Sequence, residues 1–518
     1  MKQVRSILAL TLALVLVLAM STAAFATNTT EHTITITNTQ SGHTYTAYQV
    51  FAGDVKTLDG KTVLTNITWG SGVDGESLLT ALKAANDAYA SCTTAEDVAN
   101  VLKGFENNSA ELDSFAKVVG NYLTTPAGSS ESKESPYEIT VHGDGYYFVK
   151  DTGTLGDNDA ATKYILQVIK DTTVSAKAEV PEIDKVIVNA DSNNGKDGNG
   201  TAQDVGTNVS FKLTSKVPAM DGYDSYTYIV HDTLSAGLTF NDDVTVTIGG
   251  DAYTDFTVAQ DSQSFTITFT NFINQKANAG QEIVITYSAK INGNAVIQDK
   301  ETNTVHLEYS NNPNDSSSKG KTPDKTVYVY DFDIVIDKFT GNQDDGQRLA
   351  GAMFVLKNAE GKYYSWNDET KAVKWITIES EPNTTDKTAD EIKAAWEALG
   401  ATVVTTDAKG AARFSGLDTG VYTLKEIVAP AGYNLLKDDV TVTITATYNE
   451  DGTIAESSAT ISAGDQPYQV SAIENNSGTE LPSTGGIGTT IFYILGSLLV
   501  VVAGVVLVTR KRMNASEN

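Results

Sequence analysis

The stretch Phe332-Asp333-Ile334-Val335-Ile336-Asp337-Lys338 places apolar side chains at every second position. Neighbouring residues of a β-strand face opposite sides of the sheet, so this spacing predicts a strand with one buried face. Lys338 is in phase with the apolar residues and therefore belongs to that face. Burying an unpaired ammonium group is unfavourable, so the pattern indicates that Lys338 has polar partners inside a core.

A second stretch, Ile183-Asp184-Lys185-Val186-Ile187, repeats this arrangement, with Lys185 in phase with the two isoleucines. Helical spacing of apolar residues is confined to residues 78–123 and 389–399. Alternation prevails elsewhere, for example at 33–37, 244–248 and 440–444. The sequence therefore predicts an all-β fold, in which tandem β-sandwich domains carry short helical insertions.

Each lysine has a candidate asparagine partner in what we predict to be the last strand of its domain. Asn303 is in phase with Val305 and Leu307, and Asn475 is in phase with Ile473. Because these positions also belong to apolar faces, we expect both carboxamides to be buried near the lysines.

An acid completes each set. Asp232 follows Tyr228 and Val230 on one face, and Glu426 follows Tyr422 and Leu424. We therefore expect Asp232 beside Lys185 and Glu426 beside Lys338.

Three buried groups of this kind can form an autocatalytic amide bond. Burial lowers the pKa of a lysine and raises that of a carboxylic acid, so both can be neutral together. The neutral amine can attack the carboxamide carbon while the acid shuttles protons, and ammonia leaves. The alternative is a buried salt bridge, Lys185–Asp232 or Lys338–Glu426, with the asparagine capping a strand. Periodicity alone leaves both interpretations open.

Composition restricts the class of protein. The formal net charge is −28 over 518 residues, which argues against nucleic acid and anionic membrane surfaces as partners. Cys92 is the only cysteine, so no intramolecular disulfide can form. The sequence shows no Ser/His/Asp set, zinc-type spacing or phosphate loop. We therefore expect neither an enzyme nor a cofactor. Residues 191–200 superficially suggest a calcium loop, but Gly195 breaks the ligand pattern. A solvated hairpin and no metal are predicted there.

Both ends of the chain carry export features. Lys2 and Arg5 precede an apolar run, and Ala24-Phe25-Ala26 fits a cleavage site, which predicts a signal peptide. Near the other end, a motif is followed by the uncharged segment 487–508 and a basic tail, which predicts a transmembrane helix. That motif is Leu481-Pro482-Ser483-Thr484-Gly485. Polar linkers divide the rest. The predicted segments are 1–26 (signal peptide), 27–176, 177–325, 326–478 (domains) and 479–518 (C-terminal signal).

The motif, apolar span and basic tail together resemble the cell-wall sorting signal of Gram-positive surface proteins. The resemblance implies that a sortase cuts between Thr484 and Gly485 and transfers the Thr484 carbonyl to an amine. It also implies a secreted protein that is anchored to peptidoglycan at the cell surface.

Three further segments resemble sortase-assembled, SpaA-like pilins. Residues 422–433 resemble the Glu box of CnaB-type, prealbumin-like domains, with Ile427 where Thr is usual. Residues 181–310 resemble the Ig-like CnaA-type middle domain of fimbrial backbone subunits, and residues 45–51 fit the family's N-terminal domain. The resemblance implies Lys185–Asn303 and Lys338–Asn475 isopeptide bonds, with Asp232 and Glu426 as the promoting acids. No lysine is in phase near the start of the first domain, so no crosslink is predicted there.

A polymerising pilin also needs an acceptor amine. In the family it is the lysine of a Tyr-Pro-Lys motif before the middle domain. Here that place reads Thr173-Val174-Ser175-Ala176-Lys177, without Tyr or Pro. Lys177 is the candidate, and Lys170 is its nearest competitor.

The resemblance favours a backbone pilin whose partners are sortases, identical subunits and peptidoglycan. The alternative is a minor pilin or a monomeric wall-anchored adhesin that binds a host ligand.

Overall fold

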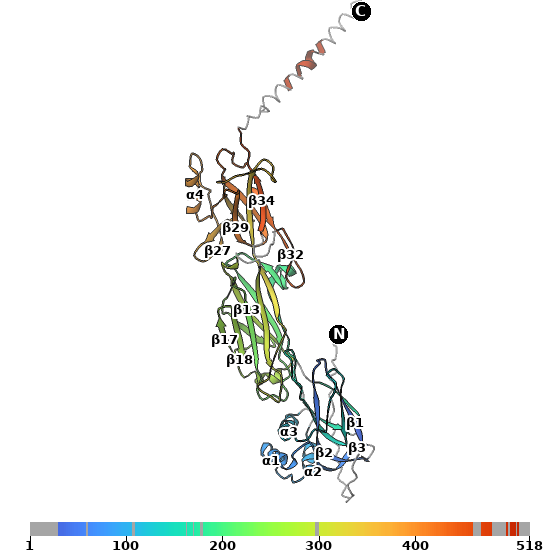
Figure 1. The fold of residues 1–518 in the computed structure, drawn as a ribbon. Coiled ribbons are helices and arrows are strands. Elements are labelled where there is room, and N and C mark those ends of the chain that lie inside the picture. Colours follow the sequence, from blue (N-terminus) through green and yellow to red (C-terminus); the bar gives the residue numbers. More distant parts are fainter. Residues whose placement is uncertain are drawn as a thin grey trace, which may run out of the picture.

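The computed structural model is an elongated molecule in which three β-rich bodies follow one another from the N-terminal to the C-terminal side (Figure 1). The structure describes residues 30–58, 61–105, 109–161, 163–168, 170–176, 180–295, 300–458, 468–478, 494–495, 498–503 and 505–506. The candidate signal peptide, Lys177 and the motif at 481–485 lie outside these residues.

The first domain consists of two sheets and a helical layer. The smaller sheet has the order β5-β1-β8, and the larger runs β3-β2-β6-β7, with β4 added beside β2. The strands are β1 (Glu31–Thr37), β2 (Tyr45–Leu58), β3 (Lys61–Trp69), β4 (Gly128–Ser129), β5 (Tyr137–His142), β6 (Gly145–Asp151), β7 (Lys163–Val168) and β8 (Thr172–Ser175).

The expected helical insertion covers the larger sheet. It consists of α1 (Gly75–Ala85), the short helix η1 (Asp87–Tyr89), α2 (Ala95–Leu102) and α3 (Ala110–Gly120). Thr94 and Asp97 form a capping box that begins α2. The apolar sides of the helices, including Leu78, Val98 and Phe115, pack with Phe148 of the sheet.

The middle domain is a sandwich of two sheets, and its inner faces form one continuous core. The first sheet has the order β10-β9-β12-β19-β15-β16, with β14 beside β19, and the second runs β11-β22-β20-β13-β18-β17, with β21 beside β20. The first contains β9 (Ile183–Ala190), β10 (Lys196–Gly198), β12 (Asn208–Lys216), β14 (Leu238–Phe240), β15 (Thr245–Ile248), β16 (Asp251–Ala252) and β19 (Glu282–Ile291). The second contains β11 (Gly200–Ala202), β13 (Tyr228–Leu234), β17 (Phe256–Asp261), β18 (Ser264–Phe269), β20 (Glu301–Ser310), β21 (Lys319–Lys321) and β22 (Lys325–Tyr330). Two short helices, η2 (Asp191–Asn193) and η3 (Phe272–Asn278), lie in its loops.

The middle domain ends later in the sequence than expected, because it includes strand β22. This strand pairs with β20 and β11 of the second sheet, so the domain extends to Tyr330, past the expected boundary at 325. Only Asp331 separates β22 from the first strand of the next domain. The polar segment 311–320 suggested the boundary, but it leads from β20 into β21 within the same sheet of the sandwich.

The third domain is a smaller sandwich. One sheet has the order β24-β23-β29, with β34 beside β23, the other runs β27-β26-β25-β30-β31, with β28 beside β25, and β32 and β33 form a hairpin. The strands are β23 (Phe332–Thr340), β24 (Gln347–Arg348), β25 (Met353–Lys357), β26 (Tyr363–Asn367), β27 (Ala372–Ile376), β28 (Val404–Thr405), β29 (Ala411–Leu417), β30 (Gly420–Val428), β31 (Val440–Ile444), β32 (Ala446–Tyr448), β33 (Ile454–Ser457) and β34 (Tyr468–Glu474). The expected second helix is α4 (Ala389–Ala398).

Hydrogen bonds join consecutive domains. At the first junction, Ala161 N–H donates to the Asn311 carbonyl at 2.7 Å. At the second, Trp375 Nε1–H donates to Asp204 Oδ2 at 2.7 Å. The loop at 191–200, expected to be a solvated hairpin, also belongs to the second junction, because Asn199 Nδ2 donates to the Glu450 carbonyl at 2.9 Å. Among the described residues, no group of three or more His, Cys, Asp or Glu side chains could hold a metal ion.

No helix in the described part of the chain combines the length and the apolar composition that a membrane crossing requires. The expected span at 487–508 falls mostly outside the described residues.

Candidate functional site

The first candidate site lies between the two sheets of the middle domain. Lys185 is on β9 of one sheet, and Asp232 and Asn303 are on the adjacent strands β13 and β20 of the other. Asp232 pairs in register with Val305, two residues from Asn303, so both side chains are on the inner face. The exposed fractions of Lys185, Asp232 and Asn303 are 2%, 1% and 0%. The structure therefore brings together all three residues selected from the sequence.

Lys185 contacts both other side chains directly, and a fourth side chain, Tyr287, links Asp232 to Asn303. Lys185 Nζ donates to Asp232 Oδ2 at 2.8 Å and also donates to Asn303 Oδ1. Tyr287, on β19, donates its hydroxyl proton to Asp232 Oδ2 at 2.8 Å and accepts from Asn303 Nδ2 at 2.8 Å. Lys185 Nζ also lies 5.5 Å from the ring centroids of Phe211 and Tyr287. The amine is thus held against the carboxamide in a water-excluded space.

Burial moves the two titrating groups toward their neutral forms. Desolvation lowers the pKa of Lys185 to about 8, although the nearby Asp232 carboxylate opposes the change. Desolvation also raises the pKa of Asp232 above its ordinary value, against the effect of Lys185. The free-energy difference between the charged pair and the neutral pair is therefore reduced, which makes a nucleophilic amine accessible near neutral pH.

The second candidate site lies in the third domain and has a different topology. Lys338 is on β23, and Asn475 directly follows β34, which runs parallel to β23. Asn475 N–H donates to the Phe339 carbonyl at 2.9 Å, which fixes Asn475 beside the lysine strand. Glu426 is on β30 in the opposite sheet. All three side chains are buried.

Glu426 contacts both other members of this set. Its Oε1 lies 3.5 Å from Lys338 Nζ, and its Oε2 accepts from Asn475 Nδ2 at 3.1 Å. Leu436 N–H holds the same Oε2 at 2.9 Å. Lys338 Nζ also donates to the Ile473 carbonyl at 3.2 Å, and burial lowers the pKa of Lys338.

One expectation about the middle site is wrong. Asn303 was expected on the last strand of its domain, but β21 and β22 follow β20 in the same sheet. Alternation reports which face a residue occupies, but not how many strands follow it. Tyr287 was missed, although Ile283, Ile285 and Tyr287 alternate toward the core, because a buried tyrosine has an ordinary packing role.

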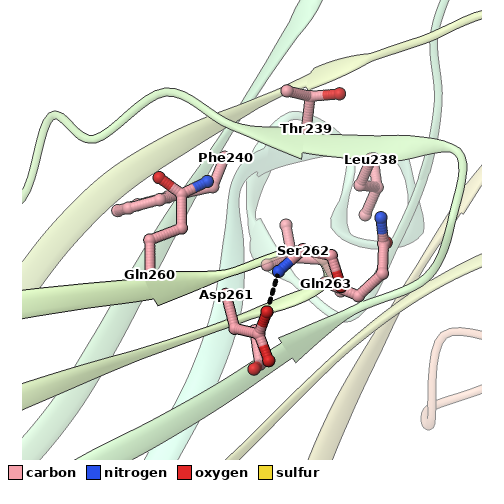
Figure 2. Close-up of a pocket in the computed structure, with 9 residues that line it drawn as sticks. Leu238, Thr239, Phe240, Gln260, Asp261, Ser262 and Gln263 are labelled. Atoms are coloured by element: carbon pink, nitrogen blue, oxygen red, sulfur yellow. Dashed lines mark hydrogen bonds between the residues drawn. The ribbon is translucent and has the colours of Figure 1, made fainter.

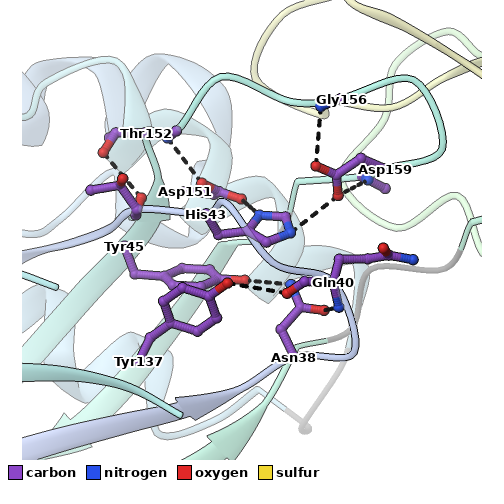
Figure 3. Close-up of polar contacts among 12 residues, drawn as sticks. Asn38, Gln40, His43, Tyr45, Tyr137, Asp151, Thr152, Gly156 and Asp159 are labelled. Atoms are coloured by element: carbon purple, nitrogen blue, oxygen red, sulfur yellow. Dashed lines mark hydrogen bonds and ion pairs between the residues drawn. The ribbon is translucent and has the colours of Figure 1, made fainter. Parts of the chain in front are cut away.

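The first domain has a histidine where the other two have a lysine set. His43 Nδ1 lies 2.6 Å from Asp151 Oδ2, and His43 Nε2 lies 3.1 Å from Asp159 Oδ1 (Figure 3). Asp151 is the last residue of β6. A histidine is no amine nucleophile for a stable amide, and the absence of a crosslink in this domain stays a prediction.

The His43 network makes the first domain sensitive to alkaline pH. Burial alone would lower the pKa of His43, but hydrogen bonds and charges of Asp151 and Asp159 outweigh it and raise the pKa from 6.5 to about 9. The stabilisation is therefore complete below about pH 6.5 and is lost as the pH rises through about 9. It amounts to about 3 kcal/mol. In the wild type, the melting temperature of the first domain should therefore decrease as the pH rises through about 9. We expect His43→Gln to remove most of this decrease.

His142→Gln is the matched control. His142 is exposed, and its acidic neighbour, the exposed Glu31, lies at the longer distance of 3.9 Å. Thermal scans at several pH values test the prediction. An unchanged pH dependence in His43→Gln would contradict it.

The molecule also has a small pocket between β14 and the turn from β17 to β18 (Figure 2). Its lining includes Leu238, Phe240 and Gln263, and Asp261 is held by the N–H of Ser262 at 2.7 Å. This lining offers no nucleophile beside a base, so it does not support a further reactive site.

Family comparisons match three parts of the chain. Residues 334–458 match the SpaA prealbumin-like fold domain, and residues 205–313 match the Cna-B-like domain of Gram-positive pilin backbone subunit 2. Residues 473–514 match the LPXTG cell wall anchor motif.

Two relatives are similar to parts of this chain. The chain is 32% identical over 168 residues to platelet adherence protein A of Streptococcus gordonii, which covers 32% of this chain and 4% of that protein. It is 26% identical over 256 residues to fimbrial subunit type 1 of Actinomyces viscosus, covering 46% of this chain and 45% of that protein. The chain thus spans less than half the length of either relative.

The T6 backbone pilin of serotype M6 Streptococcus pyogenes, which has a modular three-domain structure, has a similar fold. Its TM-score is 0.54 at 18% identity, and the alignment covers 87% of this chain and 99% of that chain.

A series of β-sandwiches followed by an LPXTG motif defines the class of this molecule, a wall-anchored Gram-positive surface protein. The anchor motif places it at the cell wall. Its middle domain matches a domain of Gram-positive pilin backbone subunits, and its third domain matches the SpaA prealbumin-like fold.

Proposed function

We propose that this protein is the structural backbone subunit of a covalently polymerised, cell-wall-anchored pilus, stiffened by internal Lys–Asn isopeptide bonds. The observation that carries the proposal is the buried contact of Lys185 with both Asp232 and Asn303, inside a domain of the pilin backbone family. The matched family models describe a fold domain, a backbone domain and an anchor motif. In this proposal the protein is no enzyme: it forms its own internal bonds and is a substrate of sortase.

The Lys185 amine is the nucleophile at the middle site. Its lone pair attacks the side-chain carbonyl carbon of Asn303, while Asp232 takes up and returns protons in a buried space. The carbon–nitrogen bond of the carboxamide breaks, and ammonia leaves. Lys338, Glu426 and Asn475 carry out the same reaction in the third domain.

The two bonds have different mechanical roles. A Lys185–Asn303 bond joins the two sheets of the middle sandwich, since β9 and β20 belong to different sheets. A Lys338–Asn475 bond joins the neighbouring parallel strands β23 and β34, which are the first and last strands of the third domain. Force applied along the rod would otherwise separate these terminal strands of the third domain, so the Lys338–Asn475 bond resists extension.

Assembly uses the C-terminal motif. In the proposed reaction, a sortase cuts after Thr484, and the Thr484 carbonyl is joined to Lys177 of another subunit or to an amine of peptidoglycan. Minor pilins and host ligands are further proposed partners.

A wall-anchored adhesin is the second candidate function. The similarity of 168 residues to platelet adherence protein A favours it. Denaturing gels of wall extracts distinguish the candidates: a backbone pilin forms a ladder of covalent polymers, whereas an adhesin gives a single band.

The intact mass of residues 27–478 tests the internal bonds. We expect a mass lower than that of the sequence by two ammonia molecules, because each buried set releases one. Peptide mapping should recover Lys185 joined to Asn303 and Lys338 joined to Asn475. A mass equal to that of the sequence would reject the crosslinks in both domains.

A further inference from the structure

Tyr287 occupies the space between the acid and the leaving group of the middle site. The described contacts connect Asp232 to the Asn303 carboxamide through the Tyr287 hydroxyl, with both hydrogen bonds at 2.8 Å. Tyr287 comes from β19, in the same sheet as Lys185, whereas the acid and the asparagine come from the opposite sheet. Four side chains from the two sheets thus close one ring of hydrogen bonds.

The chemistry of the groups fixes the direction of each bond in this ring. Lys185 Nζ offers protons, so it faces the carboxamide oxygen of Asn303. The carboxamide nitrogen then faces Tyr287 and donates to its oxygen. The tyrosine hydroxyl proton is left for Asp232 Oδ2, which also accepts from Lys185. The phenol is therefore in contact with the nitrogen that must leave as ammonia.

We propose that Tyr287 is a catalytic residue of the middle domain that relays a proton from Asp232 to the leaving nitrogen of Asn303. The proposal rests on the proposed isopeptide chemistry and adds a residue to it. It assigns to a tyrosine the step that delivers the last proton of ammonia.

The relay balances. The reaction starts from the neutral pair, with an uncharged Lys185 amine and a proton on Asp232. The amine forms a bond to the Asn303 carbonyl carbon. The Asp232 proton moves to the Tyr287 oxygen as the Tyr287 hydroxyl proton moves to Asn303 Nδ2, and the attacking nitrogen gives one proton to Asp232 Oδ2. The carbon–nitrogen bond of the carboxamide then breaks with its electron pair on nitrogen, and ammonia is released. Aspartic acid and tyrosine return to their starting states, so no other reactant is needed.

Burial suits Tyr287 to this role. The side chain is 3% exposed, so bulk water does not compete for the leaving nitrogen. Desolvation, together with the Asp232 charge and hydrogen bond, raises the pKa of Tyr287 well above its ordinary value. The phenol therefore keeps its proton across the physiological range and passes a proton on only as it receives one from Asp232.

The third domain explains why only one site needs a tyrosine. There Glu426 Oε2 contacts Asn475 Nδ2 directly, at 3.1 Å. A glutamate has one more methylene group than an aspartate, and it reaches the leaving nitrogen without a bridge. The third domain consequently serves as an internal reference in any experiment on Tyr287.

Tyr287→Phe removes the hydroxyl group that relays the proton and keeps the aromatic ring. The matched control is Tyr228→Phe, because Tyr228 is also buried in this domain but donates its hydroxyl proton to Ser215 Oγ at 2.6 Å. Intact mass at intervals after a short pulse of synthesis measures the rate of ammonia loss. We expect Tyr287→Phe to slow formation of the Lys185–Asn303 bond by about 100-fold or more, the range for a lost general acid. Tyr228→Phe should leave the rate unchanged, and the Lys338–Asn475 bond should form normally in both.

A Lys185→Met background, which cannot crosslink, separates chemistry from folding. In that background Tyr287→Phe should lower the melting temperature no more than Tyr228→Phe does. A far larger loss of stability there would mean that Tyr287 is structural and would overturn the relay. Formation of the bond in Tyr287→Phe at the control rate, with the wild type losing two ammonia molecules, would also overturn the relay alone. A wild type that loses no ammonia would instead overturn the proposed function.

Discussion

Asp232→Ala is expected to leave Lys185 and Asn303 unjoined and to destabilise the middle domain more than any other single change discussed above. Lys185 loses the group that accepts its proton, and its amine remains buried at 2% exposure without a carboxylate. Removing one partner of a buried ion pair costs about 3–5 kcal/mol, and losing a covalent crosslink has an effect like that of a disulfide, about 2–4 kcal/mol. Since these contributions overlap, we expect a loss of the order of 5 kcal/mol.

Intact mass and thermal unfolding measure the two parts of this prediction separately. The mass of Asp232→Ala should be lower than that of its sequence by one ammonia molecule, from the third domain. Glu426→Ala should also lose one ammonia molecule, but from the middle domain. Asp184→Ala is the control, because Asp184 neighbours Lys185 on the outer face and makes only a 4.0 Å contact with Lys325. It should retain both bonds and nearly full stability. Normal yield of the Lys185–Asn303 bond in Asp232→Ala would show that Asp232 is not the promoting acid.

The phase of each strand explains why the candidate sets could be predicted from the sequence. Lys185 and Lys338 lie on the apolar faces of regular strands, and the burial of both follows from that position. Asp232 and Asn303 could be selected in the same way, since their strands also alternate cleanly. A charged or amide side chain in a buried phase is rare enough to attract attention by itself.

The arrangement of the sheets could not be predicted by the same argument. A period of two gives the face of a residue but not the neighbours of its strand, so the parallel pairing of β23 with β34 was not foreseen. Strand β22 was assigned to the wrong domain because the polar segment before it resembles a linker. Its pairing with β20 depends on contacts that local sequence does not encode.

Tyr287 and His43 show a second limit. Both are polar groups whose roles depend on partners distant in the sequence. Tyr287 is 55 residues from Asp232, and His43 is 108 residues from Asp151. Tyrosine packs well in any β-sandwich core, so its phase on β19 indicates burial and no chemistry. Only the distances to neighbouring polar atoms distinguish a reactive phenol from one that fills space.

The prediction with the largest effect on assembly concerns Lys177. It follows β8, whose Thr173 and Ser175 are exposed while Val174 is buried. Continuing the alternation puts Lys177 in phase with the exposed residues, at the connection between the first and middle domains. In the sequence, an acceptor there lies between the first and middle domains, whereas the acyl donor Thr484 follows the third domain. Subunits joined in this way would all point in one direction along the fibre.

We therefore expect Lys177→Ala to abolish the ladder of covalent polymers on denaturing gels of wall extracts. Both internal crosslinks and the attachment of monomers to the wall should persist, because neither uses the Lys177 amine. Lys170→Ala is the matched control, since Lys170 is exposed and precedes β8, the strand that Lys177 follows in the sequence. Thr484→Ala should eliminate polymers and wall attachment together, because it removes the acyl group that both reactions share. If the ladder persists in Lys177→Ala and disappears in Lys170→Ala, the acceptor is Lys170, on the other side of β8. If wild-type cells that carry a pilin-type sortase give a single band, the protein is a monomeric adhesin, and the crosslinks serve its own stalk.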